Sequence, residues 1–167
     1  GATDSQFGAA RVQEDLLQRL PDLVMVEFSV NDHCTPHDME TYEGLIRQIY
    51  GSRSCPAMVL LHSVYYDTGK SAAYYHAQIG RHYDLPCISM QNGIYPAVAA
   101  GKLPAEKITA DFLHPNDLGQ EFMVAVITNF LEKVIHDKTQ EPQEIFPAPL
   151  TENAYEHCVR LQYFNST

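Results

Sequence analysis

Positive charge is scarce in this sequence. The 167 residues include 11 Lys and Arg against 21 Asp and Glu, which gives a formal net charge of -10. The basic residues do not gather into a run at any point of the chain. Because binding to a phosphate backbone depends on clustered Lys and Arg, we expect no nucleic-acid partner.

Long apolar runs are missing as well. None approaches the ~18–20 residues that a membrane-spanning helix needs, so we expect no membrane span. The chain starts at Gly1 rather than at a methionine, and no charged-then-apolar signal peptide follows. This start favours a cytoplasmic location, and it also leads us to expect that part of the protein precedes Gly1.

Cysteine is sparse and unpatterned. The four cysteines lie far apart, and no C-x-x-C pair occurs among Cys34, Cys55, Cys87 and Cys158. A disulfide framework is not expected in a chain of this size with so few cysteines. We therefore expect free thiols that are buried or partly buried.

What remains is an ordinary globular composition, with 45% apolar and 19% charged residues, long enough to bury one hydrophobic core. Apolar residues at helical spacing, and short apolar runs between them, alternate along the chain. They predict helices over about 9–20, 39–50, 71–83 and 118–138, and strands over 23–29, 57–64 and 85–90.

Strands that alternate with helices at roughly 30-residue spacing predict βαβ crossovers and a parallel sheet, so the fold class is α/β. The run 23–29 is nearly continuous in apolarity, and we expect it to be covered on both faces. Asp117 with Gln120 is typical of a capping box at the start of the last helix. Past residue 138, three prolines and no helical stripe predict a linker over 139–167 and the start of a further module.

Two polar clusters follow predicted strands or precede a helix, where ligands gather in parallel sheets. Asn31 and Asp32 come directly after the first strand, and Asp111 stands three residues before His114. A carboxylate at i can take the Nδ1 proton of a histidine at i+3 and leave Nε2 as a general base. A side-chain amide can donate to an oxygen that becomes negative in acyl transfer. Taken singly, each residue could equally be a turn-capping or helix-entry residue.

Together the clusters carry a family resemblance. "LVMVEFSVND" and "DFLHPNDLG" resemble the third and fifth conserved blocks of the SGNH (GDSL-type) hydrolases, in the right order and spacing. The stretch "GATDSQFGAARVQEDLLQRLPDLVMVEF" resembles the passage from that family's second block into the third. The resemblance covers most of residues 1–138. It implies a three-layer flavodoxin-like parallel sheet with helices on both faces, of which this chain holds strands 3, 4 and 5 in the family order 2-1-3-4-5.

The resemblance also implies roles in ester hydrolysis. His114 corresponds to the general base, Asp111 to its orienting carboxylate and Asn31 to an oxyanion-hole donor. Gly1 falls where the family offers a backbone N–H to the oxyanion, and Asp32 would support its own loop. The family's serine nucleophile lies in an upstream Gly-Asp-Ser block, so we expect this chain alone to be inactive. No cofactor is implied.

Ser5 is the only serine here that follows an aspartate, Asp4. A nucleophile block needs a buried strand in front of it, and only four residues precede Ser5. We therefore expect Asp4 and Ser5 to cap the helix that starts near Phe7.

Other functions remain open at this stage. The expected substrate is a small acyl or acetyl ester, with acetyl groups on carbohydrate as one candidate. The alternative is a non-catalytic SGNH-like module that binds carbohydrate or a protein. The tyrosines of 64–67 and 72–78 would line a sugar pocket or pack in the core.

Asp32, His33, Cys34 and His37 resemble a zinc ligand set, but Pro36 would break the helix they need, so we expect no metal. Cys34 as a nucleophile would need an imidazole positioned beside it.

The strand predicted over 23–29 has a further consequence. Without its upstream neighbour it becomes an apolar edge strand, and such edges pair with other chains. We therefore expect self-association through this strand when the chain is alone.

Overall fold

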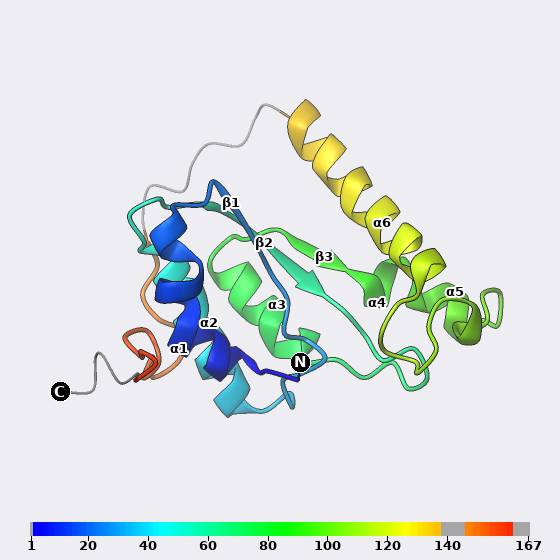
Figure 1. The fold of residues 1–167 in the computed structure, drawn as a ribbon, viewed down its shortest axis with the longest axis horizontal. Helices are drawn as coiled ribbons and strands as arrows, with labels where there is room; N and C mark the ends of the chain where they lie inside the picture. Colours follow the sequence, from blue (N-terminus) through cyan, green and yellow to red (C-terminus); the bar gives the residue numbers. More distant parts are fainter. Residues whose placement is uncertain (1, 138–145, 162–167) are drawn as a thin grey trace.

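The computed structural model describes residues 2–137 and 146–161. Three parallel strands form its central sheet in the order β1-β2-β3 (Figure 1). Val24 pairs with Met58 across the first two strands, and Leu60 pairs with Cys87 across the second and third. Strands and helices alternate along the chain, which confirms the predicted α/β class. The elements are α1 (Ser5–Asp15), η1 (Leu17–Arg19), β1 (Leu23–Val26), α2 (Pro36–Tyr50), β2 (Ala57–His62), α3 (Ala73–His82), β3 (Cys87–Ser89), α4 (Met90–Gly93), α5 (Tyr95–Ala99), η2 (Ala105–Lys107) and α6 (Asp117–His136).

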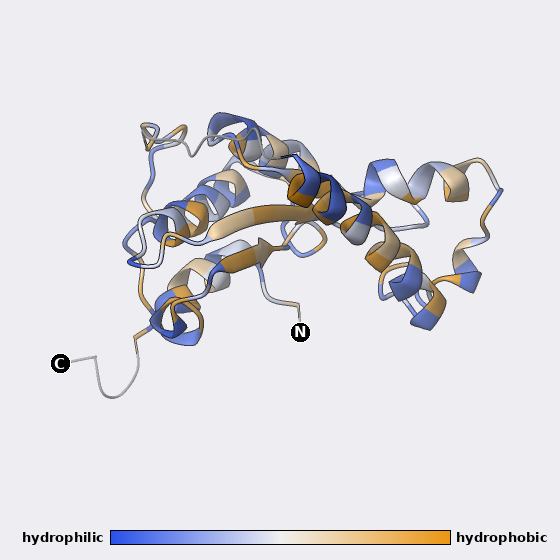
Figure 2. Cartoon of the chain, turned by 90° about the horizontal axis from the view of Figure 1, so that it is seen from above, coloured by the Kyte–Doolittle hydropathy of each residue, from blue (hydrophilic) through white to orange (hydrophobic). Residues whose placement is uncertain are grey.

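Helices cover both faces of the sheet. Successive side chains of β2 point to opposite faces, so the strand contributes to a hydrophobic core on each. Met58 and Leu60 join one hydrophobic core with α1, α2 and α3. Val59 and Leu61 join a second core on the other face, with α4, α5 and α6. Figure 1 shows α6 beyond β3, well apart from α1 and α2, and Figure 2 shows the orange, hydrophobic β2 between helices that carry hydrophilic residues. The expected three layers are therefore confirmed.

Strand β1 differs from the prediction in length and in cover. It is an edge strand of the described sheet, as expected, but it ends at Val26 rather than at residue 29. The side chains of Leu23 and Met25 are 46% and 41% exposed, whereas Val24 and Val26 are buried. The expectation of cover on both faces is therefore wrong for the described part of the chain. Self-association through this edge stays a prediction.

The starts of the helices follow local capping rules. Asp4 caps α1 by accepting a hydrogen bond from the backbone N–H of Phe7, as predicted, but the helix begins at Ser5 and not near Phe7, so Ser5 lies within the helix and does not cap it. Helix α2 begins at Pro36, three residues earlier than predicted, because Thr35 and Asp38 form a capping box and proline suits the first turn. Helix α6 is capped by Asn116, not by the predicted Asp117–Gln120 pair.

The C-terminal segment, residues 146–161, packs against α2. The carboxylate of Glu43 is buried and accepts hydrogen bonds from the backbone N–H groups of Leu150, at 2.6 Å, and of Thr151, at 2.7 Å. It also accepts hydrogen bonds from the hydroxyls of Thr151 and of Tyr83, the residue that directly follows α3. One charged side chain of α2 thus holds two consecutive residues of the C-terminal segment.

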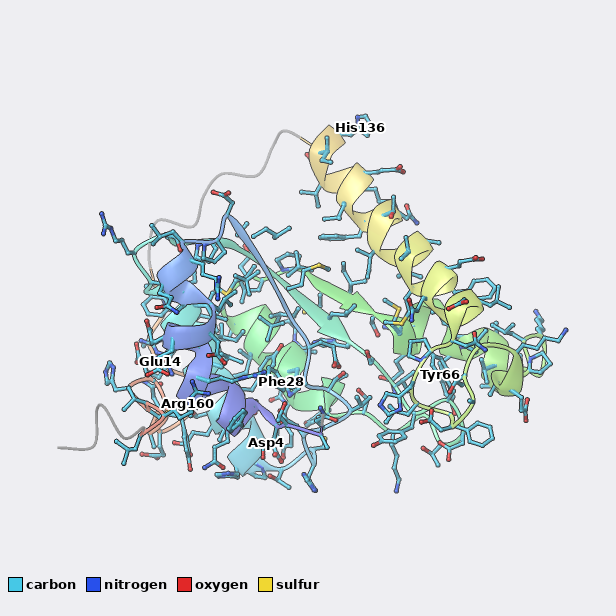
Figure 3. All side chains as sticks on the ribbon, in the orientation of Figure 1. Asp4, Glu14, Phe28, Tyr66, His136 and Arg160 are labelled. Atoms are coloured by element: carbon cyan, nitrogen blue, oxygen red, sulfur yellow. The ribbon has the colours of Figure 1, made fainter. Side chains whose placement is uncertain are left out.

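Further contacts extend this attachment. Arg47 Nε lies 2.8 Å from Glu156, and the Arg47 guanidinium lies 4.2 Å from the ring centre of Phe146. Arg160 reaches Glu14 on α1, where Figure 3 labels both residues. The predicted boundary at residue 138 stays a prediction, because residues 138–145 lie outside the described part. Residues 146–161, however, are attached to the preceding fold.

Two other expectations concern the chain as a whole. All four cysteines are free, but Cys34, Cys55 and Cys87 are exposed and Cys158 is half-buried, so the prediction of buried thiols is wrong for three of them. No helix within residues 2–137 and 146–161 is long and apolar enough to cross a membrane.

Candidate active site

The predicted Asp111–His114 pair is formed. His114 Nδ1 lies 2.6 Å from Asp111 Oδ2, and the backbone N–H of His114 donates to Asp111 Oδ1 at 2.7 Å. The backbone N–H of Leu113 and the hydroxyl of Thr109 donate to the same oxygen. One carboxylate therefore organises the loop and also orients the imidazole ring.

The hydrogen bonds around Asp111 have an electrostatic consequence. The contact with His114, together with the backbone donors, holds the pKa of Asp111 well below its usual value. Asp111 is therefore a carboxylate at neutral pH, and it can only accept from Nδ1. In the neutral ring this leaves Nε2 unprotonated. The His114 side chain is 79% exposed, and Nε2 makes no hydrogen bond with any described residue.

The backbone of this loop is fixed at both ends. Phe112 has a positive φ of 62°, and its carbonyl accepts a 2.8 Å hydrogen bond from the backbone N–H of Tyr66. Asn116 donates to the carbonyl of Ile108 at 2.9 Å as the chain enters α6. At Gly119, the first turn of α6 comes so close to Ile108 that a Cβ would lie 2.2 Å from its carbonyl oxygen.

We expect Gly119→Ala to lower the free energy of unfolding by about 1–3 kcal/mol, because overpacking forces the backbone to shift. The shift would fall on the loop that carries His114, so the Asp111–His114 pair should be displaced as stability falls. Gly51→Ala is the matched control, since its Cβ would meet only one carbonyl oxygen, at 3.3 Å. Thermal unfolding measures the loss of stability, and the NMR signals of the His114 ring report the displacement. Equal stability of the two variants would contradict the prediction.

Asn31 lies in the loop that follows β1. Its backbone N–H and that of Asp32 both donate to the carbonyl of Phe28, which makes a tight turn. Its side-chain Nδ2 donates to the carbonyl of Thr3 at 2.9 Å. An amide has two N–H donors, and only one of them is used here by the described residues. The side chain is thus oriented and keeps one donor for a ligand.

Asp32 points into the protein instead of into the loop. Its side chain is fully buried; Oδ1 accepts from the backbone N–H of Ser5 at 2.8 Å, and Oδ2 lies 2.9 Å from His76 Nε2. His76, on α3, is fully buried too and was not singled out by the sequence. It lies in the stretch "AAYYHAQ", which has the pattern of an ordinary core helix.

A pocket of about 770 Å³ opens beside Asn31 at the carboxyl end of the sheet. The hydroxyl of Tyr65 donates to the carbonyl of Val30 on one side, while Tyr66, labelled in Figure 3, holds Phe112 on the other. The loop that carries Asn31 and the loop that carries His114 thus each bond to one of two adjacent tyrosines. No hydrogen bond joins Asn31 to His114. The lining residues are 2, 29–34, 65 and 67–71. Of the predicted tyrosines, Tyr65 lines this pocket and Tyr66 is buried.

The remaining predicted residues are placed as follows. Gly1 lies outside the described residues. Ser5 is fully buried, and its hydroxyl lies 2.6 Å from that of Thr41, so it is not available as a nucleophile. Among residues 2–137 and 146–161, no three His, Cys, Asp or Glu side chains are grouped to hold a metal ion. Pro36 starts α2, and His37 lies beside Gln6.

Comparisons with known proteins give relatives among solved structures. No family model matches the sequence, and no curated protein does so either. The crystal structure of a two-domain esterase (CEX) active on acetylated mannans matches with a TM-score of 0.96 and 50% identity, over 99% of this chain and 45% of that one. The same esterase co-crystallised with mannopentaose matches with a TM-score of 0.92 and 52% identity, over 97% and 43%. The chain thus spans less than half the length of these esterases.

More distant structures share the fold. The acetyl xylan esterase AlAXEase matches with a TM-score of 0.64 and 16% identity, over 78% of this chain and 77% of that one. A GDSL-like lipase from Parabacteroides merdae matches with a TM-score of 0.60 and 20% identity, over 77% and 68%. These two likenesses concern the arrangement of strands and helices alone.

Proposed function

We propose that the chain is part of an SGNH (GDSL-type) hydrolase domain, and that the intact domain removes acetyl groups from polysaccharides of the mannan type. His114 acts as the general base, and Asp111 orients it. Asn31 donates to the oxyanion, together with the backbone N–H of Gly1, and Asp32 supports the loop that carries Asn31. The resemblance and the 50% identity to an esterase active on acetylated mannans support this proposal.

The proposed reaction begins at a serine. Its Oγ attacks the ester carbonyl carbon while His114 Nε2 takes the hydroxyl proton. The carbonyl oxygen becomes negative and accepts the free N–H of Asn31. When the bond between the acetyl carbon and the sugar oxygen breaks, His114 gives its proton to that oxygen. The sugar leaves as an alcohol and the acetyl group stays on the serine.

Water completes the cycle. It attacks the acetyl-serine while His114 again takes a proton, and the second tetrahedral intermediate collapses to acetate. The proton returns to the serine Oγ, which restores the enzyme. Asp111 stays ionised throughout and stabilises the imidazolium that forms in each half. This mechanism needs no metal or cofactor.

The serine would come from a part of the protein outside this chain. More than half of the two-domain esterase lies beyond the match, which leaves room for such a part. The family's sheet order places the serine-bearing strand against β1. A groove of about 390 Å³ lies there, lined by Met25 and Phe28 from the β1 side and by Gly8 and Val12 of α1. Most of its lining residues are apolar, although Arg11, Asp15 and Glu27 also line it, and such a lining suits a further strand.

The observation that carries the proposal is the Asp111–His114 pair with Nε2 free and exposed. The test uses the full-length protein with acetylated mannooligosaccharides, and with acetylated xylooligosaccharides for comparison. We expect NMR to detect the release of acetate. We also expect a fluorophosphonate to label one serine per molecule. Oligosaccharide binding with neither acetate release nor labelling would instead favour the non-catalytic carbohydrate-binding module.

We expect Asn31→Ala in the full-length protein to lower kcat on the order of 10²-fold, because it removes a donor aimed at the developing oxyanion. KM should change little, since the interaction strengthens only in the transition state. Asn129→Ala, at an exposed position of α6, is the control. Initial rates of acetate release give both constants. An Asn31→Ala enzyme with an unchanged kcat would refute this role.

A further inference from the structure

The loop that carries Asn31 rests on a buried pair of titratable side chains. His76 Nε2 lies 2.9 Å from Asp32 Oδ2, and neither side chain has any exposed surface. The two residues are 44 positions apart, because Asp32 follows β1 and His76 lies on α3. To bond with a carboxylate, Nε2 must carry a proton, so His76 is the donor.

The Asp32 carboxylate joins three parts of the chain. One oxygen receives His76 of α3, and the other receives the backbone N–H of Ser5, the first residue of α1. Thr3, just before α1, supplies the carbonyl that orients the Asn31 amide. The position of Asn31 therefore depends on Asp32 directly, through the shared turn, and also indirectly, through the start of α1.

His76 is itself firmly placed. Its ring stacks on Tyr42 of α2, with centroids 3.7 Å apart and planes 6° from parallel. Its second nitrogen, Nδ1, has no hydrogen-bond partner among the described residues. Among the described residues, the His76 side chain thus makes its only hydrogen bond with Asp32. Packing on Tyr42 would need only a flat or apolar side chain, whereas a buried carboxylate oxygen needs a donor.

We infer that His76 is a positioning residue of the oxyanion hole, which fixes Asp32 and through it the free N–H of Asn31. This inference rests on the proposed function, in which Asn31 stabilises the transition state. A loss of the His76 donor would let the loop after β1 relax. Misplacement of a catalytic group by about 1 Å can cost on the order of 10²-fold in rate.

The test compares three variants in the full-length protein. His76→Leu fills the space without a donor, His76→Asn is polar but too short to reach Asp32, and His76→Gln can still donate from its amide nitrogen. The readout is kcat for acetate release per active site, counted by stoichiometric fluorophosphonate labelling. This count removes unfolded molecules from the measurement, so a loss of folded protein does not imitate a loss of rate.

We expect kcat per active site to fall about 10- to 100-fold in His76→Leu and His76→Asn, with KM nearly unchanged, and to recover most of its value in His76→Gln. If His76→Leu does not fold, the comparison of His76→Asn with His76→Gln decides. Equal kcat per active site in these two variants, at any level, would overturn the inference. A wild-type protein without acetate release or labelling would instead refute the proposed function.

Discussion

Full-length His114→Ala should hydrolyse acetylated mannooligosaccharides about 10³- to 10⁴-fold more slowly than the wild type, the largest loss that we expect from any single substitution. In the proposed mechanism, His114 moves a proton in both halves of the reaction. Within the described part of the chain, no other imidazole shares the Asp111 carboxylate, which bonds to His114 at 2.6 Å. The effect should fall on kcat, because the exposed His114 side chain is not needed to hold the fold.

A second histidine, on the helix that follows the His114 loop, provides the control. His136 lies at the far end of α6, away from the loop of residues 109–116 (Figure 3), so His136→Ala should retain wild-type kcat. Steady-state acetate release and fluorophosphonate labelling of all three proteins give the comparison. Should His114→Ala keep more than about a tenth of the wild-type kcat, another group must be the base.

The second large effect concerns stability. Glu43→Leu should lower the free energy of unfolding by about 3–5 kcal/mol, because each buried donor left without an acceptor costs about 1–3 kcal/mol. Four donors lose Glu43: the fully buried Tyr83 hydroxyl, and the partly buried Thr151 hydroxyl and backbone N–H groups of Leu150 and Thr151. Urea unfolding followed by circular dichroism measures the loss.

Glu40 is the matched control for this experiment. It lies one turn earlier on α2 and accepts one hydrogen bond from the C-terminal segment, at the backbone N–H of Ala154. Glu40→Leu should therefore cost no more than about 1 kcal/mol. Limited proteolysis adds a local readout, since release of residues 146–161 should expose them to cleavage in Glu43→Leu only. Similar losses in the two variants would contradict a special role of Glu43.

The same contacts predict an acid sensitivity. Burial alone would raise the pKa of Glu43, but hydrogen bonds from Thr151, Tyr83 and the backbone of Leu150 outweigh it and leave the pKa below its ordinary value of 4.5. The unfolded chain therefore binds this proton more readily than the folded chain does. The stability that Glu43 confers is present above about pH 4.5 and is lost as the pH falls through the lower, folded-state pKa.

Sequence patterns predicted the parts of the fold that depend on local periodicity. The long helices and the three strands follow from apolar spacing, and the Asp111–His114 pair follows from an i, i+3 relation within one loop. The fold class and the family resemblance are confirmed by the structure and its esterase neighbours. Ends of elements were less accurate, because capping by Thr35 or Asn116 depends on which of several polar residues turns toward the helix.

Contacts between distant segments could not be predicted. His76 looks like a core residue of α3, and only the packing of α3 beside the loop after β1 brings it to Asp32. The sequence of the C-terminal segment shows no helical or strand pattern. Its backbone is held by side chains of α2, and such contacts leave no periodic signal in a sequence. Strand β1 reads as fully buried because its residues are nearly all apolar, yet Leu23 and Met25 are exposed.

The attachment of residues 146–161 to α2 also bears on how the protein is made. Arg47 and Glu156, which form an ion pair, are 109 positions apart. While the chain is being synthesised, α2 and α3 can pack on the sheet long before Glu156 leaves the ribosome. Until then, the Glu43 and Arg47 side chains can bond to Tyr83 but not to the C-terminal segment, and contacts of such long separation form slowly. These contacts can therefore form only late, after the C-terminal segment has left the ribosome, and until then the fold depends on contacts within the preceding residues.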